Sequence, residues 1–539
     1  MRWKLASLFT GLLMVVAVMF GTAVAPGSVD AAQVKRLIFA SAGFHESNRF
    51  WTIARPDHLQ FEPFWETLVG MDPKTGEPIP QLATKWEHST DFKDWTFHLR
   101  KGVQFHYGYG EMTSADVVHS HSLLIRKDST ATLRPVWVTV DKMETPDKYT
   151  VVFRFKNPIM PPVMMFGVQR SGDLRITSKA QWDKEGIGGL DKRPAGTGPF
   201  MYGGRQTGLN ILFKRNDKHW SGRKVEFEEL EFRIAREEAT RLALLLSGDV
   251  HIGDLPRDLH KDALAKGLKR FSSSLAVDWV SVYLGGNWHI KGHKHFDPKA
   301  PLVNKKVRQA LNIAIDREET LRTVFAGRAE LAYLSLWIPT SEGWNPKWES
   351  KFKELYAYNP EKAKQLLKEA GYGPGNPLKF QIWVFTEPGE SEGPAIGDAI
   401  AIYFKRVGVQ AEVQTHDWAK IRNAYRKYQS KNIMWPNIIG WRPADNGVRN
   451  FYFSKGNNHH YEDDFIEQTY GKVLKSNDAK ERDTLMRAIG DHIQAEYADI
   501  PLFWFRNEVF ANPKVVAEMV YPGPAAGRTS HFELIKLVK

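Results

Sequence analysis

The chain has 539 residues, of which 42% are hydrophobic and 25% charged, with a formal net charge of +12. This length exceeds what a single hydrophobic core supports, so we expect two or three domains of ordinary globular composition. The absence of cysteine excludes disulfides, thiolate metal sites and cysteine nucleophiles. The basic residues are dispersed and no nucleic-acid-binding motif is evident, so we expect no nucleic-acid partner.

The N-terminus has the features of a secretory signal. Arg2 and Lys4 precede a long uncharged apolar stretch, and small residues follow before a possible cleavage point. We therefore expect residues 1–31 to be a signal peptide and the mature chain to start near Ala32. An uncleaved anchor is the alternative, because the apolar stretch is long enough to span a bilayer. Without a cysteine for lipid attachment, a free periplasmic protein is expected.

The next clear elements are a strand and a helix. Trp95, Phe97 and Leu99 alternate with polar residues, which predicts a half-buried strand. Thr113 and Asp116 have the spacing of a capping box, so a helix is expected to begin there.

Residues 303–327 carry the strongest helical signal. The apolar residues follow an i, i+3, i+4, i+7, i+8 stripe: Val307, Ala310, Leu311, Ala314 and Ile315. Asp316 then predicts the start of a second helix, and Gly327 suits its left-handed end. Residues 359–371 repeat this pattern, with Asn359 as the cap and Gly371 as the stop.

Helix and strand signals alternate along the whole chain, which favours an α/β architecture. One clear joint runs from a helix ending near residue 406, through Gly408, into a strand that carries Val409, Ala411 and Val413 on one face. Near the C-terminus, another helix precedes the buried strand "IPLFWF".

Five segments in order carry a family resemblance: "WETLVGMDPKTGEPIPQLATKWE", "WTFHLRKGVQFHYG", "GTGPF", "NKKVRQALNIAIDRE" and "YNPEKAKQLLKEAGY". The chain resembles the substrate-binding proteins of peptide/nickel-type ABC importers, bacterial extracellular solute-binding protein family 5. The resemblance implies an α/β, two-lobed periplasmic-binding-protein fold, type II, of the large cluster with an extra inserted domain. It implies a first lobe from 32–60, 196–277 and 512–539, an inserted domain at 61–195, and a second lobe at 278–511.

The resemblance also implies a function. The protein is expected to bind a peptide or peptide-like solute between its lobes, and to deliver it unaltered to an ABC permease in the inner membrane. A monomer without catalytic residues or a cofactor is expected. A receptor for an oligosaccharide, another non-peptide solute or a metal complex is the alternative, since the 18 tryptophans suit sugar stacking. A secreted carboxylate-dependent hydrolase is more remote, because no familiar hydrolase motif occurs.

A peptide ligand presents a cation at one end and a carboxylate at the other, and an enclosed site must pair both. The segment "IIGWRPADNGVRNFY" is the best candidate for such a site. In the peptide-binding members a Gly-Trp pair precedes an aspartate that holds the amino group. The resemblance implies that Asp445 is this aspartate and that Gly440 and Trp441 are the pair before it, also in contact with the ligand. The chain departs from the pattern in a longer spacing and in Val448-Arg449, which replaces Asp-Pro. A turn-capping role for Asp445 is the plainer alternative.

Other candidate ligand contacts rest on position in the family. Trp337 and Trp344 lie in the loop after the signature helices, which faces the ligand in the family, although packing inside the loop would also explain them. His45 and Glu46 occupy a segment that lines the cleft. Arg170 and Arg175 are possible partners for a ligand carboxylate, without a motif behind them.

Several histidine groups suggest a metal site at first sight: His98, His106, His119 and His121; His289, His293 and His295; and His459 and His460 next to Glu462 and Asp463. The first group is expected to lie on a strand and a helix, with His98 on a polar side and His121 on an apolar stripe. The others are expected in polar loops. Spacing alone does not make ligands converge, so no metal site is expected.

Overall fold

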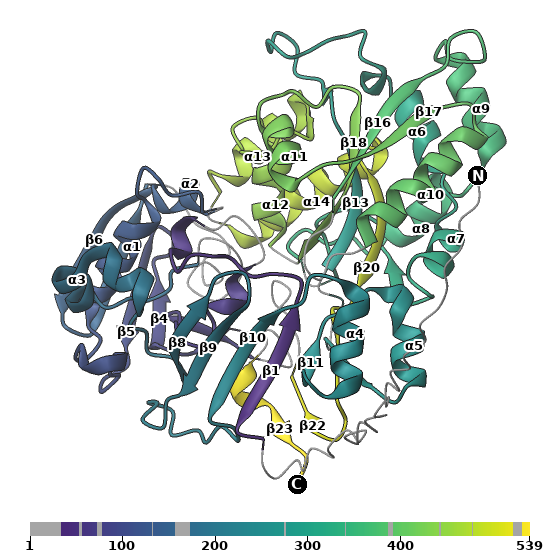
Figure 1. Ribbon diagram of the computed structural model, residues 1–539. Helices are drawn as coiled ribbons and strands as arrows, with labels where there is room; N and C mark the ends of the chain where they lie inside the picture. Colours follow the sequence, from purple (N-terminus) through teal and green to yellow (C-terminus); the bar gives the residue numbers. More distant parts are fainter. Residues whose placement is uncertain are drawn as a thin grey trace, which may run out of the picture.

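The computed structural model describes residues 34–52, 57–72, 78–131, 133–156, 173–273, 276, 278–339, 341–385, 392–440, 443–476, 478–520 and 531–539. The expected signal peptide lies outside them. Figure 1 shows a lower lobe around β1, an upper lobe around β13, and a smaller domain beside the lower lobe. This is the expected α/β, two-lobed architecture. No helix within the described ranges is both long and apolar enough to cross a membrane.

The first lobe is built on a seven-stranded mixed sheet. Its strand order is β12 (Lys269–Ser272), β21 (Glu508–Ala511), β11 (Ile252–Gly253), β1 (Arg36–Ser41), β10 (Glu229–Ile234), β9 (Asn210–Arg215) and β8 (Phe200–Gln206). β1 runs parallel to β10 and β11, whereas β8, β9 and β10 form an antiparallel meander. The helices α4 (Glu238–Ser247) and α5 (His260–Ala265) lie beside this sheet (Figure 1).

The smaller domain contains an antiparallel four-stranded sheet, in the order β4 (Ala83–His88), β5 (Asp94–Leu99), β7 (Thr150–Phe155) and β6 (Val140–Asp147). Its helices are α1 (Ser114–Leu124), α2 (Arg134–Trp137) and α3 (Lys179–Lys192). The alternating burial of β5 and the capping box between Thr113 and Asp116 are both as predicted. One continuous apolar core runs from this domain into the first lobe, so the two form one packed unit.

The glycines of the "GTGPF" segment lie at the seam between these two parts. A Cβ atom on Gly196 would lie 1.7 Å from the Phe64 carbonyl oxygen, and one on Gly198 would lie 2.6 Å from that of Pro63. Only glycine allows the two backbones to approach this closely. The Gly196 carbonyl in turn accepts a hydrogen bond from the His106 amide at 2.8 Å.

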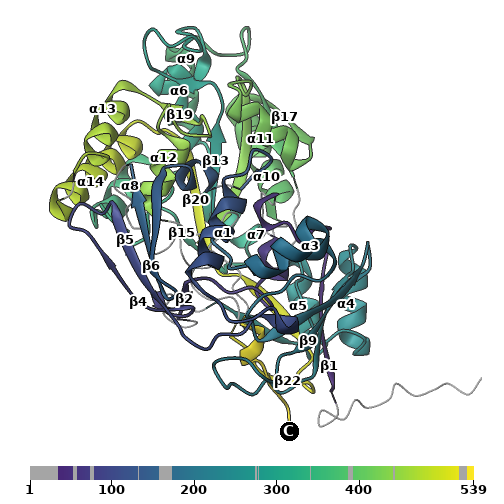
Figure 2. The same cartoon turned by 90° about the vertical axis from the view of Figure 1, so that its left-hand side faces the viewer.

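The second lobe is built on a six-stranded sheet, in the order β15 (Ala329–Leu331), β20 (Ile500–Phe505), β13 (Asp278–Leu284), β18 (Ile433–Gly440), β16 (Lys379–Val384) and β17 (Gln410–Thr415). Its helices are α6 (Lys305–Ile313), α7 (Arg317–Thr323), α8 (Trp348–Leu355), α9 (Pro360–Glu369), α10 (Glu392–Arg406), α11 (Trp418–Arg426), α12 (Ala444–Phe451), α13 (Asp464–Val473) and α14 (Ala479–Ala495). Figure 2 shows α13 and α14 side by side on this lobe. The described residues also form three two-stranded sheets: β2 (Val69–Met71) with β3 (Pro78–Pro80), β14 (Asn287–Trp288) with β19 (Tyr461–Glu462), and β22 (Val516–Glu518) with β23 (Lys536–Leu537).

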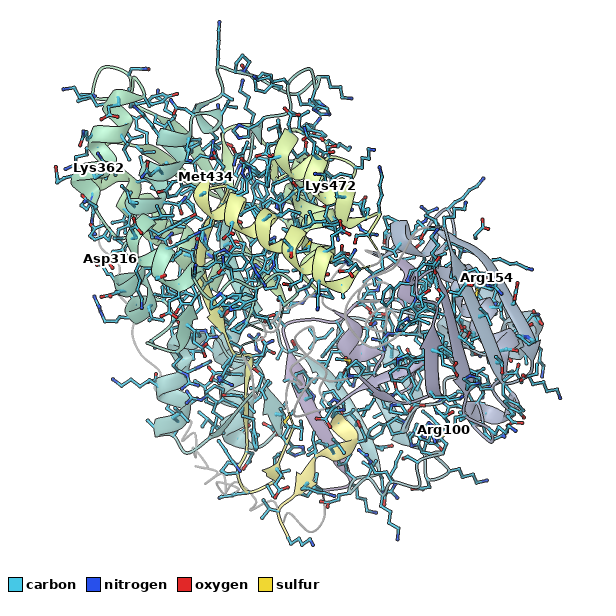
Figure 3. All side chains as sticks on the ribbon, turned by 180° about the vertical axis from the view of Figure 1, so that it is seen from behind. Arg100, Arg154, Asp316, Lys362, Met434 and Lys472 are labelled. Carbon is cyan, nitrogen blue, oxygen red and sulfur yellow. The ribbon has the colours of Figure 1, made fainter. Side chains whose placement is uncertain are left out.

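The predicted helix starts at Asp316 and Asn359 are confirmed, because both side chains accept hydrogen bonds from first-turn amides, of α7 and α9 respectively. Asn304, which was not predicted as a cap, does the same for α6. Gly371 directly follows the C-cap of α9 with the expected positive φ of 89°, whereas α7 ends at Thr323, before the predicted stop at Gly327, whose φ is 74°. Asp316 and Lys362 lie on the same outer side of the lobe, whereas Met434 of β18 lies within it (Figure 3).

The chain crosses from one large sheet to the other twice: from β12 to β13, and from β20 to β21. The passages lie side by side, because the Ser273 amide donates to the Asn507 carbonyl at 3.0 Å. The second lobe has apolar cores of its own, separate from that of the first. Strand β21 belongs to the first sheet although it lies in the range expected for the second lobe. The expected domain boundaries stay a prediction.

Candidate functional site

Strand β18 leads directly into the candidate site. All eight of its residues are buried, and its last residue, Gly440, pairs with Asp278 of β13. Trp441, one of the predicted ligand contacts, lies outside the described residues. Helix α12 then begins after Pro443, which provides no side-chain cap. The first-turn amides of α12 therefore have no partner within the helix, and Figure 1 places this helix at the lower edge of the upper lobe.

Asp445 lies in the first turn of α12 and is 4% exposed. Its Oδ1 accepts a hydrogen bond from the Tyr470 hydroxyl at 2.9 Å and lies 3.5 Å from Arg482 Nη2. Its Oδ2 lies 3.7 Å from Arg449 Nη2, one turn later on the same helix. Asp445 is therefore more than a turn cap, since its buried carboxylate faces one hydroxyl and two guanidinium groups.

Arg482, on α14, joins two carboxylates. Its Nε and Nη2 contact the two carboxylate oxygens of Glu342 at 3.1 and 3.4 Å, in addition to the contact with Asp445. Its Nη1 donates to the Val473 carbonyl at 2.7 Å, and the side chain is 2% exposed. Burial raises the pKa of Glu342, and the nearby guanidinium of Arg482 opposes this rise only in part. Arg482 thus holds together α12, α14 and the loop that carries Glu342.

That loop also contains the two predicted tryptophans. Trp337 Nε1 donates to the Glu342 carbonyl at 2.9 Å, and Trp337 has no exposed surface. The rings of Trp337 and Trp344 both pack edge-on against Trp348, at centroid distances of 5.7 and 5.3 Å. The structure therefore brings Asp445, Trp337 and Trp344 together around one ion-paired cluster. Packing within the loop accounts for Trp337, and stacking on a ligand stays a prediction for both rings.

Gly447 allows α12 to pack closely on this loop. A Cβ atom at this position would lie 2.7 Å from Leu336 Cδ1. A larger residue than the glycine of the "DNG" sequence would therefore force the Leu336 side chain or α12 to move.

His45 and Glu46 lie in the first lobe and support the turn between β8 and β9. The His45 carbonyl accepts from Arg205 Nη1 at 2.6 Å, and the Glu46 carboxylate accepts from the Gly208 amide at 3.2 Å. Burial lowers the pKa of the His45 imidazole. Across the described ranges, no contact joins either residue to Asp445. A ligand role for the two would therefore require a solute that reaches both lobes.

Of the two arginines considered as carboxylate partners, Arg175 is not part of this cluster. Arg175 is buried in the inserted domain and contacts Asp173 at 3.3 Å. Arg170 lies outside the described residues.

The histidines of the first group do not converge. In the first group, each has a partner of its own: His98 contacts Glu87, His106 contacts the Gly198 carbonyl, His119 packs on Trp182, and His121 contacts the Trp137 carbonyl. Burial lowers the pKa of His106 to about 4, so this imidazole is neutral near pH 7. No group of three or more histidine and carboxylate side chains suited to a metal ion occurs in the described part of the chain.

The later histidines form an aromatic stack. His459 and His295 stack on the Tyr428 ring at 3.8 and 4.2 Å, and His293 lies 5.1 Å from it. His459 Nδ1 contacts Glu462 at 2.5 Å, and the Tyr428 hydroxyl donates to the same carboxylate at 3.1 Å. Here His459, expected in a polar surface loop, is in fact buried, because the stacked rings cover it.

Sequence reasoning did not identify Tyr470, Arg482 or Glu342 as parts of the site. They come from α13, α14 and a separate loop, and no local pattern marks them. Arg449 did leave a signal, because the pair Val448-Arg449 stands where the family pattern has Asp-Pro.

Two lobes with separate cores, joined by two adjacent passages of the chain, define the protein as a two-lobed solute-binding protein. The chain belongs to the bacterial extracellular solute-binding proteins, family 5, since residues 77–459 match that family's middle region. It is 27% identical over 449 residues to the dipeptide-binding protein of Escherichia coli K12, covering 79% of each chain. It is 29% identical over 404 residues to heme-binding protein A of Haemophilus influenzae, covering 68% of this chain and 66% of that one. An ABC transporter-associated periplasmic binding protein from Helicobacter pylori, in complex with the peptide STSA, superposes with a TM-score of 0.76 at 22% identity, over 94% of this chain and 98% of that one.

Proposed function

We propose that this protein is the periplasmic receptor of an ABC importer. It binds a peptide or peptide-like solute between its lobes and delivers the solute, unaltered, to a permease in the inner membrane. Residues 1–31 direct secretion and are removed, and the mature protein acts as a monomer. Neither a cofactor nor catalysis is part of this function.

The observation that carries the proposal is the separation of the apolar cores of the two lobes. Two bodies with independent cores, linked by two adjacent passages of the chain, can rotate about the link without breaking either core. A solute that contacts both lobes would shift the population toward a closed form, which a permease can distinguish from the empty form. The names of the relatives, which include a dipeptide-binding protein, support the peptide as the solute class.

The proposed contacts are those expected from the sequence: Gly440, Trp441, Asp445, Trp337 and Trp344 of the second lobe, and His45 and Glu46 of the first. Their distribution over both lobes supports a solute held between them. The clustering of Asp445 with the loop of Trp337 and Trp344 supports a site at the start of α12.

Mass spectrometry under native conditions, on protein purified from its own periplasm, would identify the bound solute. A panel of dipeptides and tripeptides should then raise the melting temperature, and the binding peptide should lower the radius of gyration measured by X-ray scattering. An unchanged melting temperature and radius across the panel would contradict the proposal.

A receptor for an oligosaccharide, another non-peptide solute or a metal complex is the second candidate, and the resemblance to a heme-binding protein supports it. The substitution Asp445→Asn distinguishes the two classes. It should weaken binding of a charged peptide sharply, whereas binding of a neutral sugar should change little. Conversion of a peptide or glycoside by the pure protein would instead support the remote hydrolase alternative.

A further inference from the structure

The side chain of Arg257, from the first lobe, is buried against the second lobe. Arg257 begins the short helix η6 (Arg257–Leu259). Its guanidinium carbon lies 5.3 Å from the centroid of the Phe325 ring and 5.1 Å from that of Phe505, and both rings are buried. Its Nε donates to Glu392, the first residue of α10, at 2.6 Å. Phe325, Phe505 and Glu392 thus form a socket that offers aromatic faces and an acceptor to one guanidinium.

The other two nitrogens of Arg257 bind at the second passage of the chain between the large sheets. Nη1 contacts Glu508 at 3.1 Å, and Nη2 donates to the Arg506 carbonyl at 3.1 Å. Arg506 directly follows β20, and Glu508 begins β21. Each nitrogen of this guanidinium therefore has an acceptor, and the side chain is only 9% exposed.

Glu508 gathers partners from both lobes at the same place. Besides Arg257, it accepts from Arg328, which directly precedes β15 of the second sheet. The Ser272 hydroxyl, at the end of β12 of the first sheet, donates to the same oxygen of Glu508 at 2.8 Å. The Glu508 side chain is 2% exposed. This carboxylate therefore ties the second lobe to two strands of the first sheet, next to both passages.

A rotation of the lobes that pulled Arg257 out of its socket would leave two buried charges without each other. Loss of a buried ionic partner disfavours a conformation by at least about a hundredfold. A rotation about Arg257, in contrast, keeps the contacts with Glu392 and with the second passage. The buried position of this side chain therefore favours a contact that persists while the lobes move.

The two passages alone would not define one direction of motion. They lie side by side, with the Ser273 amide on the Asn507 carbonyl, so they act as a single point about which the lobes could bend or twist. Glu392 lies outside both passages, at the start of α10. Its contact with Arg257 adds a second fixed point, and two fixed points leave rotation about the axis that joins them.

We propose that Arg257 is the pivot of lobe closure: it stays in its socket in the open and closed forms and restricts the lobes to rotation about one axis. This inference rests on the proposed function, because closure around a solute is the motion that the pivot guides. Fewer open arrangements then compete with the one that binds the solute, which preserves affinity.

The absence of cysteine from the chain makes a direct test possible, because two introduced cysteines can carry spin labels without a background signal. Leu209→Cys in the first lobe and Ile402→Cys in α10 suit this purpose, since the two side chains are 60% and 55% exposed. Pulsed electron paramagnetic resonance on the solute-free protein then measures the centre and the width of the distribution of interlobe distances.

Two variants in this labelled protein weaken the pivot without emptying it. Glu392→Gln keeps an acceptor oxygen but loses the charge, and Arg257→Lys keeps the charge but cannot reach three acceptors at once. Each should broaden the distance distribution by at least about 1.5-fold and should move its centre by less than about 3 Å, because the lobes gain directions of motion but no new preferred arrangement.

Glu496→Gln is the matched control. It removes the charge of another glutamate that accepts from an arginine, Arg308 at 2.9 Å, but both of these residues belong to the second lobe. It should leave the width and the centre unchanged, and the melting temperatures report whether each variant folds.

The proposal would be overturned if Glu392→Gln behaved like Glu496→Gln. It would also be overturned if the centre moved by more than about 5 Å while the width stayed the same, because Arg257 would then be a latch that holds one form. Addition of the dipeptides and tripeptides to the labelled wild type is a separate test. Absence of closure with every peptide would contradict the proposed function, whereas the widths of the solute-free variants decide on the pivot.

Discussion

Arg257 of the first lobe donates from Nε to Glu392 Oε1 of the second lobe at 2.6 Å, and both side chains are more than 90% buried. Its Nη1 contacts Glu508 at 3.1 Å, and its Nη2 donates to the Arg506 carbonyl at 3.1 Å. The guanidinium therefore joins the first turn of α10 to the passage between β20 and β21, at the place where the lobes are linked. Burial raises the pKa of Glu508, but the guanidinium groups of Arg328 and Arg257 lower it by more. The pKa of Glu508 therefore lies below its usual value.

The substitution Arg257→Ala should be strongly destabilising. It would leave the buried carboxylates of Glu392 and Glu508 with fewer positive partners, and loss of one member of a buried ion pair typically costs about 3–5 kcal/mol. Urea unfolding, followed by tryptophan fluorescence, measures the free energy of unfolding.

Lys85→Ala is the control for Arg257→Ala. Lys85 pairs with Glu87 on the surface, where both side chains are more than 60% exposed, so the cost should stay below about 1 kcal/mol. Equal losses for the two variants would show that the buried position of Arg257 does not matter.

Asp499 should make the stability of the second lobe fall as the pH rises. Burial raises the pKa of this carboxyl group from 3.8 to about 6, opposed by a hydrogen bond of 2.6 Å from the Tyr452 hydroxyl. Between these two values the folded state retains a proton that the unfolded state has already released. The resulting stabilisation is present below pH 4 and is lost as the pH rises through 6; the difference between the two pKa values corresponds to about 3 kcal/mol.

Asp499→Asn should remove this dependence, since the amide oxygen can still accept from Tyr452. Between pH 4.5 and pH 7.5 the wild type should lose the stabilisation that Asp499 provides, whereas the variant should show no such loss. Urea unfolding at both pH values measures the difference. Asp141→Asn, at a side chain that is 65% exposed, should leave the difference unchanged. A parallel pH response of Asp499→Asn and the wild type would refute the role of Asp499.

Two helical glycines should respond to alanine in opposite ways. A Cβ on Gly490 of α14 would lie 2.3 Å from the Trp348 ring, whereas one on Gly471 of α13 would have no neighbour within 4 Å. Gly490→Ala should cost about 1–3 kcal/mol through overpacking, and Gly471→Ala should stabilise by up to about 1 kcal/mol through helix propensity. Thermal unfolding of the two variants is the measurement, and a stabilised Gly490→Ala would mean that α14 packs less tightly on Trp348 than described.

Gly196 should tolerate no side chain. Because the Phe64 carbonyl lies 1.7 Å from the position of a Cβ, Gly196→Ala would have to separate the inserted domain from the first lobe. We expect a loss of more than about 3 kcal/mol, or no folded protein. Gly373→Ala, which has open space, should change the stability by less than about 0.5 kcal/mol. Soluble yield and urea unfolding compare the two, and similar behaviour would contradict the close seam.

Much of the fold could be predicted because its signals are local. Asn304, Asp316 and Asn359 cap their helices through hydrogen bonds that span two or three residues. The apolar stripe of α6 and the alternation in β5 follow from the helical and strand periods alone. The two-lobed α/β fold was predicted in another way, through a resemblance to a family spread over five segments.

The site was predicted less completely. Asp445 was singled out because it follows a Gly-Trp pair as in the family pattern, but its two partners besides Arg449, Tyr470 and Arg482, lie far away in the sequence. Arg449 lies only one helical turn after Asp445, so this contact is local in sequence. The pair Val448-Arg449 was nevertheless interpreted only as a departure from the family pattern.

By itself, the sequence determined several helices and strands and the α/β class, because hydrogen bonds and apolar periods within a few residues encode them, and it indicated the family through five segments in order. Only the tertiary structure decided which charges meet, as in the pairs Arg482–Asp445 and Arg257–Glu392, and that β21 returns to the first sheet. Ion pairs and strand pairing act over a few ångströms, and the packing of distant segments alone brings such groups within that range.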